Sequence, residues 1–361
     1  MLKFHFTITA PMVRAISRVE YCRGVVSALP FSNATLAVLQ TRLLIEAIHD
    51  SRALDGEYRT PPNINAILRE GASPDNPAEA QAVTDYIRVA SWIWQRAVNR
   101  GLFTPGDIAQ MHRLAFDGLL LPGELGHWRT GQTSFLHGGA ADDQLAYIPP
   151  EPAVIPALLH DLTDWVNQAS DTPPLIMAGV AHAWLTAIRP FTDGNARIGR
   201  GLAFFLLNRA GYDFDGLIEP GHCFAADPPG YFARLTLAPT FIEAMATDLT
   251  DWLEYFLQGF AEDADQATSR AAALLTSEAD PQTERDLPAT SWRLLSCTRQ
   301  HGTISLSEAA ALLGDIPRRS LQRHLHRLVE DGYLYSVGNA RALRYSCVPI
   351  DDGAAEPSML S

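Results

Sequence analysis

Lysine is almost absent from this chain of 361 residues: Lys3 is its only lysine, so its basic chemistry depends on arginine. Cysteine is scarce as well, and Cys22, Cys223, Cys297 and Cys347 lack the paired spacing of a zinc site. No apolar run reaches the length of a transmembrane helix. We therefore expect no zinc site and no membrane partner, and the scattered thiols favour a cytoplasmic protein.

Positive charge is in deficit, because 28 Lys and Arg face 41 Asp and Glu, which gives a formal net charge of −13. Such a balance repels nucleic acid, so any DNA contact must be confined to a local cluster of arginines. The hydrophobic share of 47% is that of an ordinary globular protein. The length allows about two or three domains.

One segment, Arg189–Arg200, carries the clearest functional signal. Apolar residues recur with a helical period from Leu175 to Ile188, and Pro190 ends that helix before a second, very apolar helix follows. The residues at the predicted start of the second helix are Gly194, Asn195 and Ala196. Backbone N–H groups point outward from such a helix start, which is a ready site for phosphate.

Three charged side chains accompany this helix start. Arg197 and Arg200 are three residues apart on the helix, so both guanidinium groups lie on one face and suit a di- or triphosphate. Asp193 offers a hard oxygen ligand that would hold Mg²⁺ against the phosphates. The alternative interpretation is an ordinary joint between two helices with solvated arginines.

The complete segment closely resembles the Fic family signature His-Pro-Phe-x-Asp-Gly-Asn-Gly-Arg-x-x-Arg. The matching residues are Pro190, Phe191, Asp193, Gly194, Asn195, Arg197 and Arg200. Fic proteins typically transfer AMP from ATP to a hydroxyl group of a target protein, with Mg²⁺. The resemblance implies that Asp193 holds the metal, that Asn195 and the helix-start amides hold the α- and β-phosphates, and that the two arginines hold the phosphate tail.

Two positions depart from that signature: Arg189 replaces the family histidine, and Ala196 replaces a glycine. In the family, the histidine takes the proton from the attacking hydroxyl. Arginine has no lone pair to offer and stays protonated, so it cannot be that base. Losing a general base typically costs about 10²- to 10⁴-fold in rate. The candidates for a displaced base are His182, His127 and His137.

Two further segments resemble parts of Fic proteins. A Gly-x-x-Arg segment ending at Arg129 precedes a predicted β-hairpin flap, which in the family binds the target polypeptide as an added strand. The flap strand expected here consists of Thr133, Ser134, Phe135 and Leu136. The alternative interpretation of this stretch is a plain surface loop.

The segment Ser51–Glu57 resembles the inhibitory motif Ser/Thr-x-x-x-Glu-Gly/Asn of Fic proteins, with Ser51, Asp55 and Gly56 at the motif positions. In such proteins the glutamate pairs with the second motif arginine and blocks the ATP γ-phosphate. Asp55 is one methylene shorter and could pair with Arg200, or Glu57 could do so in another register. The alternative interpretation is an exposed helix end capped by Gly56.

The C-terminal part changes character. Three predicted helices and a hairpin about Gly338-Asn339 resemble a winged helix-turn-helix domain. The arginines that would contact DNA are Arg318, Arg319, Arg323 and Arg327 on the third helix, with Arg341 and Arg344 on the wing. Arginine suits guanine edges and phosphates, although winged helices also serve as protein-docking modules.

The expected fold is mainly α: a Fic-type helical core with a β-hairpin flap, plus the C-terminal winged helix-turn-helix domain. The expected domains are an N-terminal helical region 1–95 with the inhibitory-like motif, a Fic-like core 96–260, a linker 261–285 and the winged helix-turn-helix 286–349. A homodimer is a further expectation for the core.

The favoured function is that of a transcription regulator that binds a nucleotide such as ATP, and DNA, with impaired AMP transfer. The alternative is an active protein adenylyltransferase that binds its target protein through the flap. A third possibility is an inert scaffold in which Arg189 itself fills the phosphate site.

Overall fold

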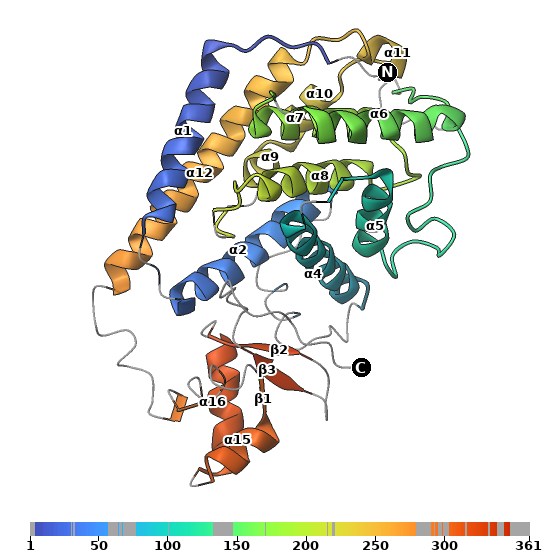
Figure 1. Cartoon of the computed structure of the whole chain (residues 1–361). Coiled ribbons are helices and arrows are strands. Elements are labelled where there is room, and N and C mark those ends of the chain that lie inside the picture. The colour runs from blue at the N-terminus through green and yellow to red at the C-terminus, as the bar shows by residue number, and fades with distance from the viewer. Residues whose placement is uncertain are drawn as a thin grey trace. The chain divides into compact units, whose positions relative to one another are not determined.

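The computed structural model describes residues 4–29, 31, 33–56, 64, 67, 77–99, 101–132, 147–169, 171–214, 216–218, 221–278, 290–291, 293–294, 298, 303–314, 316–330, 333–337 and 343–346. The chain divides into two compact units, and each is described by itself. The first unit consists of Met1–Leu29, Glu46–Thr60 and Asp75–Arg270, and the second consists of Pro30–Ile45, Pro61–Pro74 and Ala271–Ser361. Helices dominate, so the prediction of a mainly α fold is confirmed (Figure 1).

The described part of the first unit is mainly helical, with two isolated β-bridges, His5 with Asp248 and Ile148 with Thr240. Its elements are α1 (Ala10–Ser27), the C-terminal part of α2 (Asn33–Leu54), α4 (Pro77–Val98), α5 (Pro105–Ala115), the short 3₁₀ helix η1 (Pro152–Val154), α6 (Ile155–Gln168), α7 (Pro174–Ile188), α8 (Asn195–Arg209), α9 (His222–Ala226), α10 (Pro228–Leu235), α11 (Phe241–Ala244) and most of α12 (Thr250–Glu278). Several of these helices begin at a proline, whose fixed φ and missing N–H suit the first turn.

The central helix of this unit is α7, which is buried on nearly all sides. Its neighbour α8 approaches closely at Gly199, where an added Cβ would lie 2.6 Å from Thr186 Oγ1 and 2.9 Å from His182 Cδ2. The two helices that flank the functional loop are therefore packed tightly against each other, and the loop between them starts and ends at fixed positions.

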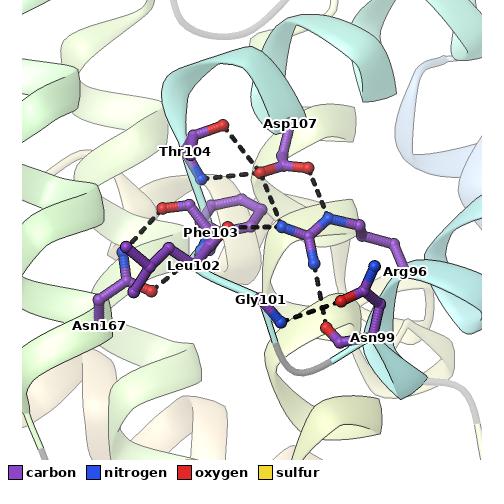
Figure 2. Close-up of polar contacts among 8 residues, drawn as sticks. All are labelled: Arg96, Asn99, Gly101, Leu102, Phe103, Thr104, Asp107 and Asn167. Atoms are coloured by element: carbon purple, nitrogen blue, oxygen red, sulfur yellow. Dashed lines mark hydrogen bonds and ion pairs between the residues drawn. The ribbon is translucent and has the colours of Figure 1, made fainter.

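The turn between α4 and α5 is fastened by Arg96 (Figure 2). Its guanidinium donates to Asp107 at 2.7 and 3.2 Å, and also to the main-chain oxygen of Leu102. Asp107 in turn accepts the main-chain N–H of Thr104 at 2.8 Å, which completes a capping box at the start of α5. This half-buried cluster holds the start of α5, and the opposite end of that helix lies at the site described below.

The long helix α12 corrects the predicted linker. Residues 261–278 were expected to be linker, but α12 continues without a break to Glu278. Ala261, Ala264 and Ala267 form a buried stripe at helical spacing, because small side chains allow close packing. Composition alone suggested a linker there, since the helix is rich in Ala and acidic residues. None of the helices in the described ranges is long and apolar enough to cross a membrane.

The described part of the second unit contains the N-terminal part of α2, the end of α12, and a small antiparallel sheet with the helices α15 and α16. Strand β3 (Arg344–Ser346) lies between β1 (Thr303–Ser305) and β2 (Tyr335–Val337). In register, Tyr345 pairs with Ile304 on one side and with Ser336 on the other. The helices are α15 (Leu306–Leu312), whose start is capped by Ser305 and Glu308, and α16 (Arg318–Glu330).

The core of this unit is aliphatic except for Tyr345. It consists of Leu294, Ile304, Ala309, Leu313, Leu321, Leu325, Leu328, Leu334 and Tyr345. Three of these leucines lie on one face of α16, which is the face that the sequence predicted to be apolar. The succession of helices and strands has the order of the expected winged helix, and that identification stays a prediction. The hairpin turn at Gly338-Asn339 lies outside the described residues.

Candidate functional site

The candidate site is the loop that joins α7 to α8. Helix α7 ends at Arg189, whose backbone is left-handed with φ of 47° and whose N–H donates to the oxygen of Leu185 at 3.1 Å. A left-handed conformation is uncommon for a residue with a side chain. The second helix begins at Asn195, directly after Gly194, which has φ of 75°. The turn predicted from the sequence is therefore present, with its ends where they were expected.

Arg129 holds the first half of this loop. Its Nε–H donates to the main-chain oxygen of Arg189 and its main-chain N–H donates to that of Pro190, both at 2.8 Å. The same guanidinium reaches the oxygen of Pro150, and the residue is 4% exposed. Burial lowers the pKa of Arg129 from its ordinary value. Arg129, from the Gly-x-x-Arg segment, thus connects three separate stretches of backbone and fixes the shape of the loop.

His112 on α5 holds the second half of the loop, and sequence reasoning missed it. Its ring is stacked on that of Phe191, with centroids 3.8 Å apart and planes 12° apart. The N–H of Gly126 donates to Nδ1 at 3.0 Å, so Nε2 carries the hydrogen and donates to the main-chain oxygen of Asp193 at 3.3 Å. Burial lowers the pKa of His112 to about 4, which keeps the ring neutral.

A sequence signal for His112 did exist. The buried face of α5 consists of Ile108, Met111, His112 and Ala115 at helical spacing. A single histidine on an otherwise apolar face has to find hydrogen-bond partners inside the fold, because a buried imidazole without them is costly. The helix pattern therefore could have indicated a polar contact, but not with which segment.

Asn195 corrects an expectation. Its side chain accepts the N–H of Phe191 and donates to the oxygen of the same residue, both at 2.9 Å. The residue is only 2% exposed, so its amide does not point into an open cradle as the sequence suggested. A short polar side chain bonds the backbone of its own loop readily, which explains why this one turns inward. In this structure Asn195 closes the loop, and any exposed phosphate contact falls to the residues after it.

The start of α8 is covered on one side by Phe116. An added Cβ on Gly194 would lie 2.2 Å from the Phe116 ring, so this position has room for glycine alone. The guanidinium carbon of Arg197 lies 4.5 Å from the centre of the same ring, in cation–π geometry. Ala196 and Arg197 are half-buried in the first turn, where main-chain N–H groups have no partner within the helix. Phosphate binding by the amides of this helix start stays a prediction.

Asp193 is the candidate metal ligand. Its side chain is exposed, and Oδ1 accepts the N–H of Gly194 at 2.6 Å. No group of three or more His, Cys, Asp or Glu residues is arranged to hold a metal within the described ranges. A single exposed carboxylate nevertheless fits Mg²⁺, which usually takes one or two protein carboxylates and completes its shell with phosphate and water oxygens.

Asp55, directly after α2, binds both motif arginines. Its Oδ2 lies 2.6 Å from Nη2 and 2.8 Å from Nε of Arg197, and its Oδ1 lies 3.1 Å from Nη2 of Arg200. The side chains of these three residues are 21%, 19% and 8% exposed. Of the two pairings that the sequence left open, the structure places Asp55 against the arginines, while Glu57 lies outside the described residues.

The charge of this cluster is firmly held. Burial raises the pKa of the Asp55 carboxyl, but Arg200 and then Arg197 lower it by more, so the pKa lies below its ordinary value. Ser51, which is also part of the inhibitory motif, lies at the edge of hydrogen-bond range, with Oγ 3.5 Å from Nη2 of Arg200. Gly56 has φ of 81°, as a helix-terminating glycine should. One carboxylate therefore occupies the two cations that the sequence assigned to a phosphate tail.

The side chain at the position of the family base stays positively charged. Burial lowers the pKa of Arg189 to about 10, which still leaves the guanidinium protonated at neutral pH. Tyr147 lies close enough to affect that pKa, and its hydroxyl donates to the oxygen of Ala187 at 2.7 Å. Burial raises the pKa of Tyr147, so it too offers no base.

The other candidate bases are not at this position in the described structure. His182 is fully buried and its Nε2 lies 2.8 Å from the hydroxyl of Tyr231. Burial, followed by the charge of Arg200, lowers the pKa of His182 to about 3, and the residue is part of the core. His127 is exposed on the segment before Arg129, and His137 lies outside the described residues.

Comparison with known proteins finds a matching family domain in part of the chain. Residues 102–207 match the model of the Fic/DOC family, and this range contains α5, α6, α7 and most of α8 with the loop described above. The chain contains a Fic/DOC family domain. Its relatives include the protein adenylyltransferase Fic of Drosophila willistoni, 28% identical over 203 residues, and that of Aedes aegypti, 28% identical over 204 residues. Each match covers 55% of this chain and only 39% of the relative.

Solved structures show the same fold. A Fic family protein from Desulfovibrio desulfuricans G20 matches with a TM-score of 0.59 and 20% identity, over 98% of this chain and 99% of that one. Fic-1 (residues 134–508) from C. elegans matches with a TM-score of 0.58 and 20% identity, over 74% and 73% of the two chains. At these identities the likeness establishes the Fic fold alone.

Two sets of predicted residues remain, those of the flap and the arginines of the C-terminal part. The flap residues Thr133, Ser134, Phe135 and Leu136 lie outside the described residues. In the second unit, the arginines of α16, which are Arg318, Arg319, Arg323 and Arg327, are all exposed. Arg344 pairs with Glu308 at 2.8 Å and bonds Thr303 at 3.0 Å, and its contact with DNA stays a prediction. Arg341 lies outside the described residues.

Proposed function

We propose that this Fic domain binds a nucleoside triphosphate with Mg²⁺ and has largely lost the ability to transfer its AMP group. We also propose that the C-terminal domain binds DNA, so that the whole protein acts as a nucleotide-responsive transcription regulator in the cytoplasm. The single observation that carries this proposal is Arg189 at the position of the family's general base.

Nucleotide binding is supported by the arrangement of cations at the start of α8. Arg197 and Arg200 already converge on the two oxygens of one carboxylate, which is also how they would hold the oxygens of a phosphate. The N–H groups of the first turn add a positive partial charge at the same end of the helix. Mg²⁺ held by Asp193 would neutralise part of the charge on the bound phosphates.

The loss of transfer follows from proton chemistry. A hydroxyl that attacks the α-phosphate has to lose its proton, and a group within hydrogen-bond reach must accept it. Arg189 keeps its own proton, because its pKa of about 10 lies well above neutral pH. Its charge can still stabilise phosphate oxygens, so binding survives where proton abstraction does not.

DNA binding is supported by the exposed arginines of α16. Arg319, Arg323 and Arg327 lie across the helix from the leucines that form the core of the second unit, which leaves one face of this helix basic in a chain of net charge −13. A recognition helix with this pattern would contact phosphates and guanine edges in the major groove. Substituting Arg319 and Arg323 together with alanine should weaken binding to genomic fragments in a mobility-shift assay without lowering the melting temperature.

The deciding experiment compares AMP transfer by three forms of the full chain: the native sequence, Arg189→His and Arg189→Gln. With labelled ATP and Mg²⁺, Arg189→His should raise self-labelling about 10²-fold or more, because it restores a base. Arg189→Gln removes the charge without adding a base, so it should leave labelling near the native level. Equal labelling by all three forms, or equal gains in both variants, would show that the position does not hold the base.

An active adenylyltransferase is the second candidate, and the names of the relatives favour it. The same experiment separates the two functions. An active enzyme would show native labelling within about tenfold of the Arg189→His variant, because a displaced base would already supply most of the factor. Isothermal titration with ATP and Mg²⁺ tests the binding half of the proposal: no detectable heat from the native chain or from the Asp55→Asn variant would refute it.

A further inference from the structure

A second cluster of titratable groups lies at α2, the helix that Asp55 directly follows. Asp50 lies on α2, and its carboxylate stands between two imidazoles: Oδ2 is 2.7 Å from Nδ1 of His222, and Oδ1 is 3.2 Å from Nδ1 of His49. Asp50 is 9% exposed, whereas the side chain of His222 is 45% exposed. A buried carboxylate on α2 is thus paired with a solvent-accessible histidine from α9.

A second buried carboxyl group faces the same histidine. Asp263 on α12 is 5% exposed, and burial raises its pKa to about 7, although the charge of His222 and contacts with Cys223 oppose that rise. The nearby charge of Asp50 also raises the pKa of Asp263. His222 therefore lies beside the carboxyl group of Asp50 and close to a second carboxyl group, that of Asp263, which gains its charge near neutral pH.

The remaining groups around His222 do not cancel this arrangement. The titratable and charged residues that face His222 or its direct neighbours are Asp50 and His49 on α2, Cys223 on α9, and Glu262, Asp263 and Arg270 on α12. Burial raises the pKa of the Cys223 thiol well above its usual value, so the thiol stays neutral. Arg270 lies 2.9 Å from Glu46, one turn before Asp50 on α2, and forms an ion pair that does not include His222.

The sign of the pH response follows from His222. Its hydrogen bond with Asp50 raises the pKa of the imidazole, burial opposes this, and the charges of Asp50 and Asp263 raise it further. A raised histidine pKa means that the contact is fully formed below about pH 6.5 and is lost as the pH rises through the folded value. Above that value a neutral imidazole lies between two carboxylates, Asp50 and Asp263, which repel each other.

We propose that His222 and Asp50 form a proton-operated latch that holds the C-terminal turn of α2 in place, and that the latch loosens when His222 loses its proton. Asp55 follows this turn directly, so the latch controls how firmly Asp55 occupies Arg197 and Arg200. This inference rests on the proposed function in one respect: the nucleotide phosphate and Asp55 compete for the same two arginines. ATP then binds more tightly at pH 8 than at pH 6.

Amide hydrogen exchange of residues 46–56 tests the latch directly, after correction for the intrinsic effect of pH on exchange. In the native chain, protection of this segment should fall between pH 6 and pH 8 by about two- to fivefold, the range of a partly exposed ion pair. His222→Gln should show, at both pH values, the lower protection that the native chain has at pH 8. His222 is substantially exposed, so this variant is expected to fold.

The matched control is Arg270→Gln, which removes the neighbouring pair with Glu46 and leaves His222 in place. It should lower protection at both pH values and retain the pH dependence. A native response that persists unchanged in His222→Gln overturns the proposal, and so does a native chain without any response.

ATP binding by calorimetry separates this inference from the proposed function. Between pH 6 and pH 8, the affinity of the native chain for ATP should rise about two- to fivefold more than that of His222→Gln. The variant corrects for the titration of ATP itself, because both proteins meet the same nucleotide. If exchange follows the pH but ATP binds at neither pH, even to Asp55→Asn, the latch stands and the nucleotide function fails. If ATP binds with the same pH dependence in both proteins and exchange does not respond, the function stands and the latch is overturned.

Discussion

Replacing Asp55 with asparagine should destabilise the protein and strengthen its nucleotide binding at the same time. The substitution keeps the size of the side chain and removes its charge. Two guanidinium groups then face each other without a counter-ion, and one of them, Arg200, is only 7% exposed. Because the carboxylate occupies the cations expected to hold phosphate, its loss has opposite effects on the free protein and on the complex.

The magnitude follows from burial. Breaking a fully buried ion pair from one side costs about 3–5 kcal/mol, whereas exposed pairs are worth about 1 kcal/mol or less. The side chains of Asp55, Arg197 and Arg200 are 21%, 19% and 8% exposed, so the cost lies between these limits, at about 2 kcal/mol. In Asp55→Asn, ATP no longer has to break the contacts of Asp55 with the two arginines, so the Kd of the variant for ATP should fall by about 5- to 30-fold.

The matched control is Asp107→Asn, in the cluster of Figure 2. Asp107 pairs with Arg96 at 2.7 Å, and the two side chains are 12% and 15% exposed, so the loss of stability should be similar. That cluster lies at the turn between α4 and α5 and contains none of the motif residues. The affinity of the Asp107→Asn variant for ATP should therefore stay at the native level.

Chemical denaturation and calorimetry with ATP and Mg²⁺ provide the two readouts. The pH dependence adds a third, because a carboxyl whose pKa is lowered by folding contributes stability above its unfolded value near pH 4, and that stability is lost as the pH falls further. The Asp55→Asn variant should lose less stability than the native chain on such acidification. Equal stability together with unchanged ATP affinity would refute the reasoning, since it would mean that the arginines do not depend on Asp55.

Three further predictions concern the loop and its surroundings. Gly194→Ala should destabilise the protein by about 2–4 kcal/mol in urea, because the methyl group meets Phe116 and the backbone is left-handed; Gly131→Ala, with open space around it, should have little effect. His112→Phe keeps the ring stacking but loses two hydrogen bonds, so it should cost about 1–3 kcal/mol and weaken ATP binding in calorimetry. Asp85→Asn should raise the melting temperature at pH 7 but not at pH 4. Burial raises the pKa of the Asp85 carboxyl to about 6, so this group destabilises the folded state only at a pH where it is ionised in the unfolded chain. An equal effect of Asp85→Asn at both pH values would contradict its charge as the cause.

The loop of the Fic domain could be predicted because its signals are local. Pro190 cannot continue α7, and Asp193-Gly194 is turn chemistry before a strongly apolar helix. Such preferences act between neighbours in the chain and survive in any fold. The apolar face of α16 was predictable for the same reason, since Leu321, Leu325 and Leu328 recur at helical spacing.

Composition misled where packing decided the outcome. Residues 261–278 look like a polar linker, but Ala261, Ala264 and Ala267 bury a narrow stripe and α12 continues through them. Asn195 was expected to face a phosphate, yet its amide closes its own loop on Phe191. In both places the side chain has two acceptable environments, and only its neighbours in space select one.

The sequence by itself determined that this protein has a helix start rich in arginine, and that a permanent cation replaces the family's base, because those properties belong to single residues and their immediate neighbours. Only the tertiary structure decided what those arginines contact. Asp55 is 142 residues from Arg197, and His112 is 81 residues from Asp193, so no local spacing relates them. Their contacts exist because the burial of apolar faces brings α2, α5 and α8 together, and a charge or imidazole carried into that interior is stable only beside a partner.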